Sequence, residues 1–282
     1  MKEKTKSIGQ AICGKPTWAN RVVLSIGTAL VASGLLVGSS SALAGDEDRD
    51  GRGEQPKVFP PDSHPYGADY AQWSARWWQW SFAFPTTADP ELGTADFDAN
   101  QSGRVWFLPT PFNGATLTRK GTIPEGTALF GPVLTTWWDN TGCPNYTDFT
   151  ADQLKGLVEQ NWSPVTETSC TVDGVAVHGM NNPQDTPYFV FSPPFAYTLA
   201  AHDNVLAGIF GEPCIPDGTT VFPAVAGGVY VMIEPLPVGH HTIHFGAVVG
   251  PIANPALTFD VTFDITVVPQ RDHDDGHDHD SR

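Results

Sequence analysis

The sequence predicts a mostly β protein. We expect an antiparallel β-sandwich, immunoglobulin-like or jelly-roll-like, with an aromatic N-terminal α-helix packed on it and one further short helix. Short apolar runs are separated by frequent Pro and Gly residues, which is typical of strands joined by turns. The longest of these runs, 257–268, alternates apolar and polar residues without a break, as a strand with one buried face does. A segment rich in Trp at 65–84 follows a helical repeat instead.

The helix at 65–84 presents one continuous aromatic stripe, since its large rings recur at alternating steps of four and three residues and Pro85 ends the run. An exposed stripe of this kind would stack on sugar rings. Exposing so much aromatic surface would also invite aggregation, so we expect the stripe to face the core. The residues of the stripe are Tyr66, Tyr70, Trp73, Trp77, Trp80 and Phe84.

The remaining elements follow in order after a loop at 86–103. A short strand begins at Val105, and a Pro/Gly turn from Thr122 leads into another. A second helix is predicted at 151–161, because Thr150 and Gln153 have capping-box spacing. Further strands are predicted at 188–191, 195–199, from 229 and from 240, ahead of the alternating strand at 257–268.

The N-terminus has the pattern of an export signal. Residues 1–21 are basic, 22–38 are apolar, and Ala42 and Ala44 occupy the small-residue positions of a signal-peptidase site. The alternative is an uncleaved membrane anchor, but the apolar run is short for a span of roughly 20 residues and is diluted by Ser, Gly and Thr. We therefore expect a signal peptide at 1–44 and a secreted or periplasmic protein with no stable membrane insertion after cleavage.

Charge and composition divide the rest of the chain into a linker, a domain and a tail. Residues 45–57 are charged and lack apolar side chains, so we expect an acidic disordered linker before a single domain at 58–269. The last segment, 270–282, is a His/Asp-rich tail predicted to be disordered. The full chain has a formal charge of −16, and losing the basic signal peptide makes it more negative still. Such a surface repels phosphate backbones, so nucleic acid is not an expected partner.

Three cysteines follow the predicted cleavage site, and their odd number leaves one unpaired. An oxidising compartment permits a disulfide. Cys143 and Cys170 lie in loop-like sequence, so we predict that they are joined and that Cys214 is free, although Cys214 could compete for either partner. We expect a structural role for all three, since no histidine or basic group near them would activate a thiol.

Two groups of histidines are candidate ligands for Zn²⁺, Ni²⁺ or Cu²⁺. On a strand, His240 and His244 point to one face, so they would bind a metal if Glu234, His178 or His202 supplied a third ligand. An ordinary hairpin with surface histidines explains the same pattern, and we favour it because two ligands do not define a site. The tail can bind divalent metal loosely and without catalysis. Its histidines are His273, His277 and His279.

One further group is a candidate ligand site. Trp137 and Trp138 adjoin Asp139, and a tryptophan beside an acid can hold a sugar, although it can equally form the edge of a core. Paired carboxylates for glycoside cleavage stay open, because their separation is a property of the fold. A serine triad is not indicated, since no G-x-S-x-G motif is present.

Four segments together resemble a family of uncharacterised secreted bacterial proteins. They are YGADYAQWSARWWQW from Tyr66, QSGRVWFLP from Gln101, TIPEGTALFGPV from Thr122 and GVYVMIEPLPVGHHTIHFG from Gly228. The resemblance implies export and a shared fold, and it transfers no activity and no catalytic residue. Where that family has a cysteine just before the TIPEG-like turn, this chain has Gly121, and an upstream partner is also missing, which is consistent with the joint loss of one disulfide.

These observations favour a secreted, non-catalytic β-sandwich protein that binds an extracellular ligand or a cell-surface component, with a glycan as the favoured class. One alternative is a secreted hydrolase or lyase, either metal-dependent through His240 and His244 or using paired carboxylates. A structural envelope protein is the other. A cleft with converging His, Asp or Glu would favour the enzyme, and a flat aromatic platform would favour glycan binding.

Overall fold

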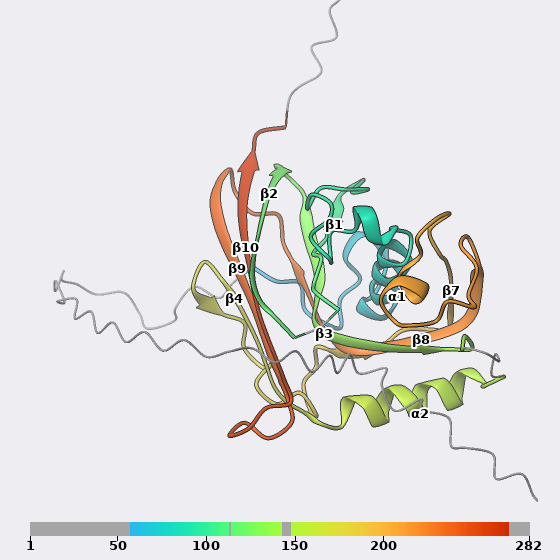
Figure 1. Ribbon diagram of the computed structural model, residues 1–282. Helices are drawn as coiled ribbons and strands as arrows, with labels where there is room; N and C mark the ends of the chain where they lie inside the picture. The colour runs from blue at the N-terminus through green and yellow to red at the C-terminus, as the bar shows by residue number, and fades with distance from the viewer. Residues whose placement is uncertain (1–56, 113, 143–147, 271–282) are drawn as a thin grey trace, which may run out of the picture.

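The computed structural model describes residues 57–112, 114–142 and 148–270. The chain folds into two mixed, mainly antiparallel β-sheets packed together, with an aromatic-rich helix against them (Figure 1). The predicted fold class is thus confirmed. The signal peptide at 1–44 and nearly all of the linker and tail lie outside the described residues and stay predictions.

The first sheet has the order β1-β3-β8-β6, and β7 also pairs with β8. All its pairs are antiparallel except β1–β3, which is parallel. Both β3 and β8 are buried along most of their length, because helices cover the two faces of this sheet. The strands are β1 (Val105–Phe107), β3 (Ala128–Asp139), β6 (Phe189–Phe191), β7 (Phe195–Thr198) and β8 (Thr220–Ile233).

The second sheet has the order β2-β10-β9-β4-β5, with β2 and β10 parallel and the other pairs antiparallel. β10 shows the alternation expected from its sequence, since Phe263 and Ile265 are fully buried while Thr266 is exposed. One face of the sheet therefore joins the core, and the other carries polar side chains. The strands are β2 (Thr116–Pro124), β4 (Val165–Val172), β5 (Val175–Ala176), β9 (Gly239–Val249) and β10 (Leu257–Val268).

Helix α1 (Tyr70–Ser81) begins where Asp69 forms a capping box with Gln72, so it is shorter than the predicted 65–84. Tyr66 lies three residues before Asp69, in the short η1 (Pro65–Gly67). Its backbone is left-handed, with a φ of 55°. The expected burial of the stripe is confirmed for Trp77 and for every other member except Tyr66, which is half-buried.

Helix α2 (Ala151–Trp162) covers the face of the first sheet opposite α1 (Figure 1). It matches the predicted helix and its capping box, and it buries Leu154 and Val158 against Trp138 and Val225. Two short helical turns complete the fold, η2 (Thr86–Ala88) and α3 (Val205–Gly208). The main core lies between the two sheets and contains the aromatic side chains of α1.

Candidate functional site

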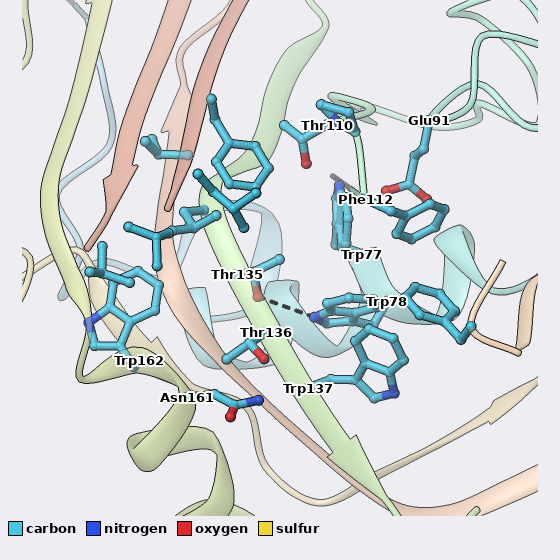
Figure 2. A pocket seen from close by; sticks show the side chains of 18 residues that line it. Trp77, Trp78, Glu91, Thr110, Phe112, Thr135, Thr136, Trp137, Asn161 and Trp162 are labelled. Atoms are coloured by element: carbon cyan, nitrogen blue, oxygen red, sulfur yellow. Dashed lines mark hydrogen bonds between the residues drawn. The ribbon is translucent and has the colours of Figure 1, made fainter. Parts of the chain in front are cut away.

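A cavity of about 80 Å³ lies where α1, β3 and the inner face of the second sheet meet (Figure 2). Its walls are mostly aromatic and aliphatic, and Phe112, Phe210 and Asn161 are partly exposed at its rim. The lining comes from segments far apart in the sequence, so only the folded chain assembles it. The lining residues are Trp77, Trp78, Glu91, Thr110, Pro111, Phe112, Val133, Leu134, Thr135, Thr136, Trp137, Asn161, Trp162, Val165, Phe210, Val249, Leu257 and Phe259.

Four tryptophans dominate this wall, and the ring centroids of Trp78 and Trp137 are 4.7 Å apart. Each indole N–H already donates a hydrogen bond within the protein. Trp77 donates to Leu108 O, and Trp78 donates to Thr135 Oγ1. Trp137 donates to Asp139 Oδ2, and Trp162 donates to Pro183 O. The tryptophans therefore offer the cavity apolar ring surface and no free donor.

Two polar atoms in the lining have no hydrogen-bond partner among the described residues. They are Oε1 of Glu91 and Nδ2 of Asn161, and both atoms are buried. Glu91 is only 2% exposed, and Ser81 Oγ donates a hydrogen bond to its other oxygen, Oε2. Buried polar groups are nearly always paired, so these two unpaired atoms in one cavity mark positions where a ligand or water would bind.

Glu91 belongs to a buried acid pair. Burial raises the pKa of the Glu91 carboxyl well above its usual range, and the nearby charge of Asp89 raises it further. Burial likewise raises the pKa of Asp89 to about 6, against hydrogen bonds from the backbone of Glu91 and Leu92. The charge of Arg119 lowers the pKa of both acids, but for each of them it is smaller than the effect of burial. Burial therefore favours the neutral form of the Glu91 carboxyl.

The loop that carries Glu91 is fixed by its own hydrogen bonds. Asp89 Oδ1 accepts from Glu91 N at 2.7 Å, and Thr94 Oγ1 accepts from Asp89 N at 2.7 Å. Arg119, which points inward from β2, donates from Nη2 to Glu91 O at 2.6 Å. Gly93 passes so close to this guanidinium that a Cβ would lie 2.8 Å from Nη1, and its φ is +74°. Glycine is needed there for both reasons.

The predicted ligand site at Trp137, Trp138 and Asp139 has a different arrangement from the one expected. Neighbouring side chains on a strand point to opposite faces, so Trp137 lines the cavity while Trp138 packs under α2. Asp139 is 1% exposed and accepts hydrogen bonds from Trp137 Nε1, Thr141 and Tyr197 Oη. These three side chains form no exposed platform for a sugar.

The histidines of β9 are each paired with an aspartate. His240 Nε2 lies 2.6 Å from Asp264 Oδ1, and His244 Nε2 lies 2.7 Å from Asp260 Oδ1, both on the outer face of the second sheet. His241 points the other way and contacts Asp173 at 2.8 Å. Within the described part of the chain, no group of three or more His, Cys, Asp or Glu residues could hold a metal ion. The tail histidines His273, His277 and His279 lie outside the described residues.

The disulfide prediction is wrong in its pairing. Cys170 is a free thiol, 1% exposed on β4, because strand alternation turns it into the core rather than leaving it in a loop. Cys214, predicted to be free, is exposed and disulfide-bonded. Cys143 lies outside the described residues. Burial raises the pKa of the Cys170 thiol, which keeps it protonated and unreactive.

Sequence reasoning missed Asp89, Glu91, Arg119 and Asn161. The segment 86–103 reads as a polar loop, and Asn161 is the last residue of a predicted helix. No motif or periodicity in this polar stretch singles out Asp89 or Glu91. Only Trp137, among the predicted site residues, belongs to the cavity.

Comparison with known proteins gives no further assignment: no family model matches the chain, and no curated protein matches it. Among the helices that the structure describes, none is both long enough and apolar enough to span a membrane.

Proposed function

We propose that this chain is an exported, non-catalytic binding protein for a small, mostly apolar, neutral ligand that carries hydrogen-bond acceptor oxygens. The observation that carries the proposal is the tryptophan-walled cavity with two unpartnered buried polar atoms, Glu91 Oε1 and Asn161 Nδ2. An apolar pocket with a few converging polar groups is the usual form of a small-molecule site.

The size of the cavity limits what it can enclose. A volume of about 80 Å³ is roughly half that of an engineered 150 Å³ cavity that holds benzene. The enclosed part therefore accepts a group of about four or five non-hydrogen atoms. A whole sugar ring does not fit inside, so this cavity favours a ligand more apolar than a glycan.

The polar groups define the chemistry of the ligand. A neutral Glu91 carboxyl can donate its proton in a hydrogen bond, and Asn161 Nδ2 is a donor in any state. Glu91 and Asn161 lie on opposite sides of the cavity, so a ligand with a carbonyl, ether or hydroxyl oxygen would pair with one of them (Figure 2). A cation would require Glu91 to ionise in a buried site, which burial opposes. An unpaired buried donor costs about 1–3 kcal/mol, which binding of an acceptor would recover.

The enzyme alternatives draw less support from this geometry. Glu91 is the one ionisable side chain among the described residues that line the cavity. A paired-carboxylate hydrolase needs a second carboxyl facing the same bond, and Asp89 is not part of the lining. His240 and His244 face away on the outer surface of the second sheet.

Tryptophan fluorescence of the full chain, titrated with cyclobutanone, tests the proposal. We expect saturable binding, with methylcyclobutane binding more weakly because it lacks the oxygen. Glu91→Gln keeps a donor and should retain the preference for the ketone, whereas Glu91→Leu should abolish it. Glu125→Gln, on an exposed turn, is the matched control.

The pH dependence gives a second readout. Since a neutral Glu91 donates to the ligand, affinity for the ketone should fall as pH rises through the raised pKa of Glu91. Glu91→Gln should remove that dependence. Equal affinity for both probes in every variant would refute the assignment of Glu91.

A further inference from the structure

A second, open hollow of about 510 Å³ lies outside the cavity, between α1 and the segment before β1. It shares no lining residue with the tryptophan-walled cavity. We call it the arginine groove, because two arginines lie on its wall together with aromatic rings. Its residues are Tyr66, Trp73, Arg76, Ser102, Gly103, Arg104, Val105 and Phe107.

Each arginine is stacked on an aromatic ring of the groove. Arg76 Cζ lies 4.5 Å from the centroid of the Trp73 ring, and Arg104 Cζ lies 5.0 Å from that of Tyr66. Stacking occupies one face of a guanidinium and leaves the N–H groups at its edge to bind an oxyanion. Neither arginine has a carboxylate partner within salt-bridge distance among the described residues.

This pair stands out in a chain with a net charge of −16. Most of the other basic side chains of the described residues contact protein groups outside the groove. Arg119 holds the Glu91 loop, Lys120 pairs with Asp264 at 3.5 Å, and Lys155 lies over the Phe191 ring. The arginine groove therefore presents two arginines that have no carboxylate partner among the described residues of an acidic protein, where they attract an anion locally.

The backbone beneath both arginines is anchored. Arg76 lies on the exposed face of α1, and the Arg104 carbonyl accepts a hydrogen bond from Ala128 N at 2.9 Å. Gln101 closes the intervening loop, since it donates to Phe107 O at 2.7 Å and accepts from Phe107 N at 2.9 Å. Tyr66, whose ring lies under Arg104, has a φ of 55°. A positive φ is uncommon for a bulky residue and has a conformational cost.

We propose that the arginine groove is a subsite for the carboxylate or sulfate group of an acidic saccharide. The two guanidinium edges would bind the oxyanion, and the half-buried rings of Tyr66 and Phe107 would contact the C–H face of the sugar. The groove is large enough for a sugar ring, since ligand sites are commonly about 300–1,000 Å³. This site is independent of the small neutral ligand proposed for the cavity.

Calorimetric titration of the full chain at low salt tests the proposal with three probes. They are a galacturonate trisaccharide, its methyl ester, which has no carboxylate charge, and sodium sulfate. We expect the trisaccharide to bind about tenfold or more tightly than the ester, and its affinity to fall with added salt. Sulfate binding as tightly as the trisaccharide would overturn the saccharide assignment and leave a free-anion site.

Variants locate the binding. The double variant Arg76→Gln, Arg104→Gln should weaken the trisaccharide about tenfold or more, and Arg→Lys at both positions should restore only part of the affinity, because lysine lacks the planar fork. Lys155→Gln is the matched control, since it removes another exposed cation stacked on a ring but lies outside the groove. Unchanged binding in the double variant, equal loss in the control, or no binding by any probe at millimolar concentration would each overturn the proposal.

Discussion

The Tyr197 hydroxyl donates a 2.7 Å hydrogen bond to Asp139 Oδ2, which joins β7 to the end of β3 in the interior. The same carboxylate accepts from Trp137 Nε1 and, through Oδ1, from the Thr141 backbone and hydroxyl. Asp139 therefore organises the end of the first sheet, and its role is structural.

Removing that carboxylate should destabilise the fold. Asp139→Ala removes the acceptor of several buried donors, among them Trp137 Nε1, and a buried donor that loses its acceptor costs about 1–3 kcal/mol, whereas Tyr197→Phe removes a single hydrogen bond. Urea denaturation measures both. A wild-type free energy of unfolding in Asp139→Ala would show that the network contributes nothing to stability.

Replacing Trp77 with Ala should lower the free energy of unfolding more than replacing an exposed residue of the same helix with Ala. Trp77 is 1% exposed, so Trp77→Ala should lower the free energy of unfolding by about 3–5 kcal/mol. Gln79→Ala, at an exposed position inside α1, is the control and removes only one exposed side-chain hydrogen bond. If the two variants melted at the same temperature, the stripe would not be part of the core.

Cys170 should resist chemical modification in the folded protein. Its thiol is buried and its pKa is raised by burial, so a maleimide reagent should react with it only after unfolding. Peptide mapping without reduction should find Cys170 free and Cys214 in a disulfide. Rapid labelling of Cys170 under native conditions would contradict this expectation.

Asp89 should make stability depend on pH. Its pKa rises from 3.8 to about 6 on folding, so the folded state binds more protons between those values. The stability that Asp89 contributes is fully present below about pH 3.8 and is lost as pH rises towards 6. Glu91, whose pKa is also raised, acts in the same direction.

The difference between wild type and Asp89→Asn isolates this contribution, because Asn does not titrate and keeps an acceptor oxygen for Glu91 N. Urea denaturation from pH 3.5 to 7 should show the variant gaining stability relative to wild type as pH rises. Asp185→Asn, in an exposed loop, is the control. A difference that did not vary with pH would show that the pKa of Asp89 is the same in the folded and unfolded states.

Elements with a strong local pattern were predictable from the sequence. The aromatic helix, the capped second helix and the alternating strand at 257–268 each carry a repeat that only one conformation satisfies. β2 and β4 were missed because threonines occupy many of their positions and few large apolar residues mark their inner faces. The two parallel pairings were not predictable, since they join strands distant in the sequence.

The candidate site was largely hidden from sequence reasoning for a similar reason. The burial of Glu91 results from Ser81 on α1 and Arg119 on β2, and neither contact has a local signature. The tryptophans were recognisable as large apolar groups, but their grouping around one cavity depends on how α1, β3 and α2 pack. Residues that meet only in the folded chain have no regular spacing in the sequence, unlike the residues of a periodic helix or strand.

The parallel pairing of β2 with β10 constrains when the protein can fold. Lys120 on β2 lies opposite Asp264 on β10. Because β2 is synthesised long before β10, it has no neighbouring strand until β10 is made. Pairing between such distant strands is slow, because a long loop must close first. The second sheet therefore cannot gain its β2 edge until β10 has been made.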